Sequence, residues 1–411
     1  MKKMSRENRN FLMILIGIMV IWAVYLFPFK FGGWNQIMLA FSYRYGFIQR
    51  AFIGSVIDLV STVFHIPLKY MRYLYGVATV GIFTLGALLL VNKSLDRFAD
   101  DGRMKQFYKG MALLFFMGAG WSTNYNNFAL TDMWLPMISL IGVFAIIRGK
   151  HIWISLIATI ICVLIHPASV FLYFNLILAA FVYKVFLNKE KKNKNDAIWL
   201  AVVLTVGSLL FLYMMFFSHA RADVTVDEVM QRAAVVVDKS VAEISNHEPT
   251  VRGYLIRDGG ESGVQLVFNS YWLLFLVIVV MFSPFLYEIY RYWRMAYQEA
   301  KGSGTKGSIF YALLPLGIVT TIPMYIMHND YGRWTYAVYF YEFAIIWMFN
   351  LLKDGNIRRA TYRYMERVSS NKAYYALLLF YAVISGPFEQ NLINPMISMI
   401  ETMGWKILGV Y

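Results

Sequence analysis

Long stretches without charged side chains restrict the folds open to this chain more than any other feature. Many apolar runs approach the roughly 20 residues that a helix needs to cross a hydrocarbon layer about 30 Å thick. A helix satisfies its own backbone hydrogen bonds in lipid, so the sequence predicts an all-α, polytopic integral membrane protein. The net charge of +14 alone would suggest nucleic-acid binding, but 59% apolar and 15% charged residues exclude a soluble nucleic-acid binder and a disordered chain. The single Cys162 excludes a disulfide scaffold.

The apolar runs predict about 11 transmembrane helices. They cover roughly residues 11–29, 71–91, 108–122, 131–147, 152–165, 168–187, 197–217, 266–289, 309–327, 335–352 and 373–387. His166-Pro167 separates the fifth run from the sixth. Because proline disfavours helix at the preceding residue, we predict a tight turn there, with one kinked helix as the alternative.

The charges between the runs predict the orientation in the membrane. With the N-terminus in the cytoplasm, the inner segments and adjoining helix ends hold 25 Lys and Arg side chains. The outer segments hold only 11 Lys and Arg side chains, together with 13 Asp and Glu side chains. Short cytoplasmic loops of membrane proteins carry an excess of positive charge, so a cytoplasmic N-terminus and an extracytoplasmic C-terminus are predicted. The first run has no small-residue cleavage site and is interpreted as a retained span rather than a signal peptide.

Two transmembrane modules and one sizeable outer loop are predicted. Residues 1–217 form an N-terminal module of seven spans, which includes the first outer loop 30–70. Residues 218–265 form an extracytoplasmic amphipathic loop, and residues 266–411 form a C-terminal module of four spans with an outer tail. Within the first outer loop, the apolar segment 51–64 is too short to span a membrane and is predicted to be an interfacial helix.

The loop 218–265 has the pattern of an amphipathic helix. Thr225 and Glu228 form a capping-box pattern, and apolar residues recur at helical spacing from Val226 to Ile244. The opposite, polar face carries Asp227, Glu228, Gln231, Arg232, Asp238 and Lys239. This pattern predicts a helix on the membrane surface or over a cavity, with a lid and a passive interfacial helix as alternatives.

The distinctive polar motifs all fall on the predicted outer side. They are FSYRYGFIQRAFIGS at 41–55, WSTNYNNFALTDMWLP at 121–136, HPAS at 166–169, HNDYGRW at 328–334, and Glu389 in the last outer segment. Polar groups at this depth are costly unless they pair or line a cavity, so we predict one convergent extracytoplasmic site. The alternative is that each motif only caps a helix or anchors it at the interface.

Three arginines are the predicted phosphate-binding residues. Arg44, Arg50 and Arg333 are chosen because a planar guanidinium donates two parallel hydrogen bonds to a phosphate. On one helix Arg44 and Arg50 would point about 120° apart, so they would flank a ligand rather than stack on one face. Binding to membrane phospholipid is the alternative for the two arginines of the first outer loop.

Four residues are candidates for proton transfer: Asp132, Asp330, His328 and Asp58. Asp132 opens the fourth span, where capping a helix N-terminus is its alternative role. For Asp330 the alternative is an ion pair with Arg333 across a turn, and for Asp58 it is a solvent-facing position on the interfacial helix. No HxH or HExxH spacing occurs, so a divalent metal is only weakly indicated and no metal ligand is assigned.

Six further outer residues are predicted to contact substrate. Their polar side chains offer the hydrogen-bond donors and acceptors that sugar hydroxyls need. The residues are Tyr45, Asn124, Asn126, Asn127, His166 and Glu389. For a single histidine beside a proline the alternative is a helix cap, and for the tyrosine it is an anchor at the membrane interface.

These features together resemble the GT-C class of membrane glycosyltransferases. That class has about eleven to thirteen spans and a long first outer loop with two juxtamembrane helices, which 33–43 and 51–64 match here. The segment 126–146 resembles the second outer loop of the class, where an acidic residue opens the fourth span, and this maps onto Asp132. The chain departs from the class in the first outer loop, because residues 30–57 contain no acid. The arginine-rich outer face also resembles bacterial O-antigen and capsule polymerases.

Both resemblances imply the same chemistry. They imply transfer of a sugar from a polyprenyl-phosphate or -diphosphate donor to an extracytoplasmic glycan or glycolipid acceptor, in polysaccharide biosynthesis of a bacterial cell envelope. The implied partners are membrane lipid, the lipid-linked donor and the acceptor, with no nucleic acid. The alternative class is a transporter or a flippase of lipid-linked sugar, which would need ionisable residues near the bilayer midplane; Glu342 is the clearest one here.

Overall fold

Helices make up almost all of the described chain. The computed structural model describes residues 5–25, 36–126, 130–187, 194–255, 271–327 and 331–385. No β-strand occurs in these ranges, so the predicted all-α class is confirmed for them. Each of the eleven predicted spans overlaps a helical segment.

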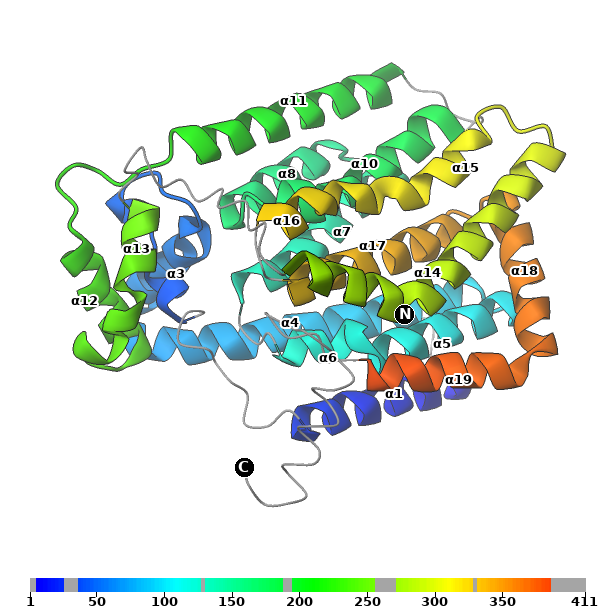
Figure 1. The fold of residues 1–411 in the computed structure, drawn as a ribbon, viewed down its shortest axis with the longest axis horizontal. Coiled ribbons are helices and arrows are strands. Elements are labelled where there is room, and N and C mark those ends of the chain that lie inside the picture. Colours follow the sequence, from blue (N-terminus) through cyan, green and yellow to red (C-terminus); the bar gives the residue numbers. More distant parts are fainter. Residues whose placement is uncertain are drawn as a thin grey trace.

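Long helices form a bundle, and shorter ones connect or cover it (Figure 1). The bundle helices are α1 (Arg6–Tyr25), α4 (Leu68–Arg97), α5 (Gly102–Met117), α7 (Trp134–Arg148), α8 (Trp153–Ile165), α10 (Phe174–Val182), α11 (Lys194–Phe216), α14 (Tyr271–Gly302), α17 (Tyr331–Leu351) and α19 (Lys372–Ile384). The shorter or covering segments are η1 (Met38–Ala40), η2 (Tyr43–Tyr45), α3 (Ala51–Phe64), α6 (Ala119–Asn126), η3 (Thr131–Met133), α9 (Ser169–Leu172), η4 (Tyr183–Leu187), α12 (Val226–Val237), η5 (Ala242–His247), α13 (Glu248–Leu255), α15 (Ile309–Leu313), η6 (Leu314–Thr321), α16 (Ile322–Met327) and α18 (Gly355–Ser370).

Several helices have the length and composition of membrane spans. Five qualify among the described residues: Arg6–Tyr25, Leu68–Arg97, Thr131–Arg148, Asn195–Phe216 and Ile309–Ile326. The number rises to six if Gly332–Leu351 and Gly355–Ser370, which are bent by 113° relative to each other, count as one. Apolar side chains point outward along much of α1 and α11, with Val24 70% and Phe216 65% exposed. Apolar surface of this extent fits a helical membrane protein.

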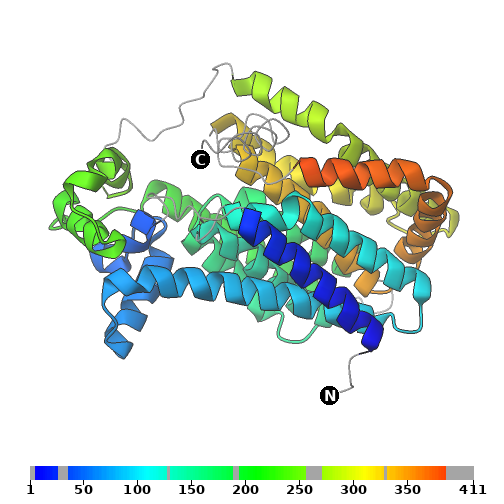
Figure 2. The same ribbon diagram turned by 90° about the horizontal axis from the view of Figure 1, so that it is seen from below.

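The bundle has two distinct ends. In Figures 1 and 2 the long helices lie side by side along the longest axis of the molecule. Helices α3, α12 and α13 gather at one end, on the left of Figure 1, which we call the α12 end. Helix α18 lies across the other end, which we call the α18 end.

Ion pairs and hydrogen bonds bring the predicted cytoplasmic loops together at the α18 end. Asp101 caps the N-terminus of α5 and also accepts from Arg358 Nη2 at 2.5 Å and from Tyr362 Oη at 2.5 Å. Burial raises the pKa of Asp101, but the hydrogen bonds from Tyr362, the Met104 amide and Arg358 outweigh it, so the pKa lies below its ordinary value. This carboxylate therefore fastens α18 to the start of α5.

The α12 end is a small covering layer built on the predicted first outer loop. Arg232 of α12 forms an ion pair with Asp58 of α3, and its Nε donates to the Ala40 carbonyl at 3.0 Å. Gly54 lets α3 pass close to η1, because an added Cβ would lie only 1.8 Å from the Phe41 carbonyl oxygen. The predicted interfacial helix at 51–64 is thus present, but one side of it packs against protein.

The predicted amphipathic helix of the outer loop differs from expectation in two ways. Thr225 accepts a hydrogen bond from the Glu228 amide, as the capping pattern predicts. The helix ends at Val237, because Asp238 adopts a left-handed conformation with φ of 57°. Arg232, which the pattern places on the exposed face, is buried with a side chain 6% exposed. The expectation for Arg232 was wrong because the partly buried carboxylate of Asp58 compensates its charge.

A break between two helices lies at His166-Pro167, where a tight turn was predicted between the fifth and sixth apolar runs. Helix α8 ends at Ile165, His166 is extended with φ of −155°, and α9 begins at Ser169. Helix α7 packs against both α8 and α10 and is half buried, whereas the other candidate spans are much more exposed. The N-terminus of α7 is therefore held at the centre of the bundle, and the predicted site residue Asp132 lies there.

Candidate functional site

Four predicted site residues meet near the α12 end of the bundle. Arg50, Asp132, His166 and Arg333 come from four separate parts of the chain. Each residue lies at or near the end of a helix, and the four side chains contact one another in a chain of close contacts. The convergence predicted from the sequence is therefore observed for these four residues. We call them the Arg-His-Asp cluster.

Asp132 and Arg333 form the central ion pair of the cluster. Arg333 Nη1 donates to Asp132 Oδ2 at 2.6 Å, and the two side chains are 10% and 12% exposed. Asp132 lies in η3 immediately before α7, and Arg333 lies in the first turn of α17. The Arg333 guanidinium also lies over the Trp334 ring, 5.2 Å from its centroid. The pair therefore joins the starts of the two helices.

His166 is fixed by the turn that Pro167 imposes. The Ala168 amide donates to His166 Nδ1 at 3.0 Å, so a neutral imidazole in this arrangement carries its proton on Nε2. That Nε2 lies 3.9 Å from Asp132 Oδ2 and 2.6 Å from Arg50 Nη2. The Arg50 Nη2 hydrogen points at His166 Nε2, so it finds an acceptor there only when the imidazole proton is on Nδ1; with the proton on Nε2 the two groups are facing donors.

Arg50 is held in place by its backbone and by an aromatic ring. It is the residue before α3 and adopts a left-handed conformation with φ of 61°, which is costly for a side chain other than glycine. Its guanidinium lies 5.1 Å from the ring centroid of Tyr254 in α13. The Arg50 Nε is buried and makes no hydrogen bond within the described part of the chain. Strain and an unused donor of this kind are typical of a binding residue.

The charges of the cluster do not balance. Counted over its own four residues, two guanidinium groups face one carboxylate, so the cluster has one more positive than negative side chain when His166 is neutral. Such a group of donors suits an anion, because an anion accepts several charge-assisted hydrogen bonds at once. The pocket bordered by Asp132, Arg333 and Trp334 measures about 30 Å³, which is room for roughly one water molecule. An anion larger than water must therefore displace a side chain to enter.

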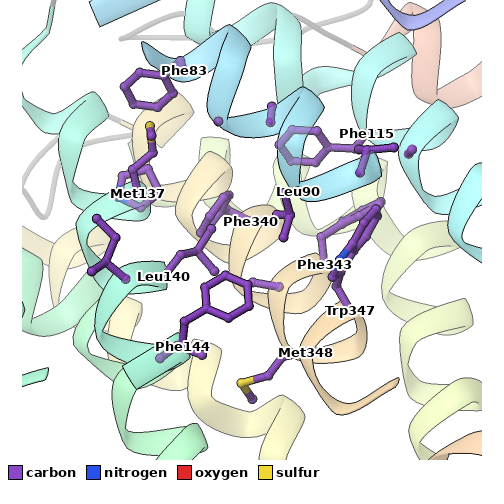
Figure 3. Close-up of a pocket in the computed structure, with 18 of the residues that line it drawn as sticks. Phe83, Leu90, Phe115, Met137, Leu140, Phe144, Phe340, Phe343, Trp347 and Met348 are labelled. Carbon is purple, nitrogen blue, oxygen red and sulfur yellow. The ribbon is translucent and has the colours of Figure 1, made fainter. Parts of the chain in front are cut away.

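A much larger apolar cavity begins beside this pocket. It measures about 270 Å³ and lies among α4, α5, α7 and α17 (Figure 3). Aromatic and aliphatic side chains line it, and no charged side chain does. Tyr336 borders both the cavity and the small pocket. The cluster and the cavity are therefore neighbours.

Three predicted site residues have other surroundings. Asp58 pairs with Arg232 and thereby fastens α12 to α3. Arg44 is exposed, with its guanidinium 5.5 Å from the ring centroid of Tyr45. Tyr45 is 2% exposed, and its carbonyl accepts from the Arg221 amide at 2.8 Å. These contacts give Asp58 and Tyr45 structural roles at the α12 end.

The remaining predicted residues are not placed by the structure. Asn127, His328, Asp330 and Glu389 lie outside the described residues. Asn124 and Asn126 belong to α6, but their side chains are outside the described part as well. Where side chains are described, no group of three or more His, Cys, Asp or Glu is arranged to hold a metal ion.

Two residues of the site were missed by sequence reasoning. Tyr254 covers Arg50, and Tyr336 separates the cluster from the cavity. Neither residue stands in a motif that marks a function, and each meets its partner only through packing of distant segments. The one available signal is position, because Tyr336 follows Arg333 by a single helical turn.

No family model matches the chain, and no curated protein or solved structure matches it. The resemblance to GT-C enzymes therefore stays a prediction from sequence motifs. The physical basis for a function is the cluster and the cavity described above.

Proposed function

We propose that the protein is a membrane glycosyltransferase that transfers a sugar from a polyprenyl-phosphate or -diphosphate donor to an extracytoplasmic acceptor. The observation that carries the proposal is the Arg-His-Asp cluster, in which two arginines and a histidine surround one carboxylate. Glycosyl transfer needs cations for the departing phosphate and a base for the acceptor hydroxyl. The cluster offers both within one small volume.

The proposal includes the orientation of the chain. Eleven spans with a cytoplasmic N-terminus would place the cluster on the outer side of a bacterial cytoplasmic membrane. Two observations support this: the basic segments gather at the α18 end, and the cluster lies toward the opposite end. Lipid-linked sugars displayed on the outer leaflet would then reach the cluster directly.

Each residue of the cluster has a role in the proposed reaction. Arg50 and Arg333 bind the phosphate oxygens, and His166 Nε2 donates to the same group. The acceptor oxygen forms a bond to the anomeric carbon while the bond from that carbon to the phosphate oxygen breaks. Asp132 takes the proton of the acceptor hydroxyl, and the phosphate leaves with the bonding electron pair, its charge held by the arginines.

Asp132 must leave Arg333 before it can act as a base. In the structure its Oδ2 is bound to the guanidinium at 2.6 Å, which lowers its ability to take a proton. The donor phosphate is a stronger partner for Arg333 than a carboxylate with one hydrogen bond, because it offers several charged oxygens. Donor binding would thus free the carboxylate at the moment that it is needed.

Loss of surface glycan in defined variants tests the proposal. Cells of the source organism that carry Asp132→Asn as their sole copy should lose the glycan that the wild type assembles, while the protein stays folded in the membrane. Asp58→Asn is the matched control, since Asp58 is an outer acid that is paired with Arg232. Normal glycan in Asp132→Asn cells would rule out Asp132 as the base.

A polymerase of the O-antigen or capsule type is the closest alternative, and it would use the same cluster.

A transporter or flippase is favoured by one observation. The segment from Ile309 to Met327 is interrupted by the 3₁₀ helix η6, whose Gly317 carbonyl accepts from Asn175 Nδ2 at 3.0 Å. Transport of lipid-linked sugar that survives Asp132→Asn would favour this alternative over transfer.

A further inference from the structure

We infer that Trp334 is an anion-binding residue, whose indole N–H donates a hydrogen bond to the phosphate held by the Arg-His-Asp cluster. The inference rests on the proposed function, because it takes the anion to be the phosphate of the lipid-linked donor. It adds a neutral hydrogen-bond donor that the reaction proposed above does not use.

The Trp334 side chain is buried with an unused donor. The residue is 1% exposed, and its Nε1 is buried and makes no hydrogen bond within the described part of the chain. Other tryptophans of the bundle use theirs: Trp22 Nε1 donates to the Phe116 carbonyl at 3.0 Å, and Trp347 Nε1 donates to Ser94 Oγ at 2.9 Å. A buried donor without an acceptor is costly to stability, and a bound ligand that supplies the acceptor would remove this cost.

Trp334 lies where the cluster meets the small pocket. It borders the pocket of about 30 Å³ together with Asp132 and Arg333. The Arg333 guanidinium lies over the Trp334 ring, 5.2 Å from its centroid. A cation binds the face of an indole, whereas the N–H projects from the edge of the ring. The same ring can therefore hold Arg333 and donate to a ligand.

The unused groups at the cluster select the charge of the ligand. Two buried nitrogens there, Arg50 Nε and Trp334 Nε1, lack a hydrogen bond to any described residue. Both are donors that cannot accept. A sugar hydroxyl donates as well as accepts, but the nearby acceptor Asp132 Oδ2 is already bound to Arg333. An oxyanion only accepts, so it satisfies both donors and leaves no donor of its own unpaired.

The size of the pocket limits how the anion reaches the indole. Its volume has room for roughly one water molecule. One phosphate oxygen needs about that much room, so a single oxygen fits beside Trp334 while the arginines hold the others. Trp334 thus contributes one hydrogen bond to a phosphate that the charged residues position.

Binding of inorganic phosphate to the full-length protein in lipid nanodiscs tests the inference. Trp334→Phe keeps an aromatic ring beside Arg333 but removes the N–H. Trp347→Phe is the matched control, because it makes the same chemical change at a tryptophan that borders the apolar cavity and already donates to Ser94. Geranyl phosphate, a short prenyl phosphate, is the second probe and distinguishes the phosphate of a lipid from the free ion.

Trp334→Phe should bind both probes about tenfold more weakly than the wild type, because one hydrogen bond to a charged oxygen is lost. Trp347→Phe should bind inorganic phosphate as the wild type does. Thermal unfolding without ligand should give the reverse order. Both variants lose packing, but only Trp347→Phe also breaks a hydrogen bond, so it should unfold at the lower temperature.

A measurement on the wild type makes the test independent of how the variants fold. With tryptophan labelled at the indole nitrogen for NMR, one indole N–H signal should move downfield as phosphate saturates the protein. The shift is expected because the N–H gains a charged acceptor.

Three outcomes would overturn the inference. Equal phosphate affinity of Trp334→Phe and the wild type, or an indole spectrum that phosphate leaves unchanged, would mean that the N–H binds only water. Equal weakening of binding in both phenylalanine variants would indicate lost packing rather than a lost donor. If the wild type binds neither probe, the proposed function fails together with the inference, whereas weaker binding in Arg50→Ala with unchanged binding in Trp334→Phe overturns the role of Trp334 alone.

Discussion

Arg333 donates a hydrogen bond to Asp132 across a separation of 201 residues, with Nη1 and Oδ2 at 2.6 Å. This contact joins the N-terminal ends of α7 and α17, and it neutralises one of the two arginines in the cluster. Arg50 keeps its charge, and its Nε stays without a hydrogen bond among the described residues. The unused donor on Arg50 is the feature that an anionic ligand would satisfy.

Removing both members of the central ion pair should cost less than the two single removals added together. Arg333→Ala or Asp132→Ala leaves a nearly buried charge uncompensated, which is expected to destabilise the protein by about 3 kcal/mol. The double variant should cost clearly less than the sum of the two single variants. Thermal unfolding in detergent of the four proteins completes the double-mutant cycle, and strictly additive losses would contradict a direct interaction.

Arg50 should matter far more than Arg44 for donor binding. Arg50 faces His166 in the cluster, whereas Arg44 is exposed and contacts the Tyr45 ring. We expect Arg50→Ala to weaken binding of geranyl phosphate by a factor of about 10 to 100, because a charge-assisted hydrogen bond contributes about 1.5–3 kcal/mol. Arg44→Ala should change it less than threefold. Equal losses would instead indicate general attraction of anionic lipid to the outer arginines.

Gly54→Ala should prevent the first outer loop from folding. The added methyl group would lie 1.8 Å from the Phe41 carbonyl oxygen and 2.8 Å from that of Leu39, and neither backbone atom can move far inside the packed α12 end. Gly81→Ala provides the control, since its surroundings are open and alanine favours helix. The yield of monodisperse protein after size-exclusion chromatography measures the effect, and near-normal yield of Gly54→Ala would show that α3 can shift.

Acidification should weaken the α18 end through Asp101. Its pKa in the folded protein lies below the ordinary value of 3.8, so its contribution to stability is present above that value and is lost as pH falls through the folded pKa. Between about pH 6 and pH 3 the wild type should lose more thermal stability than Asp101→Asn does. At neutral pH the variant should be less stable by about 1–3 kcal/mol, because Arg358 and Tyr362 lose a charged acceptor.

Cysteine labelling from the two sides of the membrane should separate the two ends of the bundle. Lys239→Cys at the α12 end and Lys301→Cys at the end of α14 introduce exposed thiols, while the native Cys162 is buried. An impermeant maleimide added to intact cells should label position 239 only, and position 301 should react after the membrane is opened. Labelling of both positions in intact cells would contradict the proposed orientation.

Several features follow from the sequence alone because they depend on local composition and spacing. The eleven apolar runs predicted helical segments, and each overlaps a helix. The capping pattern at Thr225 predicted the start of α12 correctly. Arg50, Asp132, His166 and Arg333 stood out because polar residues beside apolar runs are costly without partners.

Tertiary structure decided how those residues are used. No pattern showed that Arg333 binds Asp132, or that Asp58 binds Arg232. The apolar cavity was equally hidden, since lipid-facing, packed and cavity-lining side chains share one composition in a membrane helix. Helical periodicity fixes the face on which a residue lies, but only the packing of distant helices determines what that face meets.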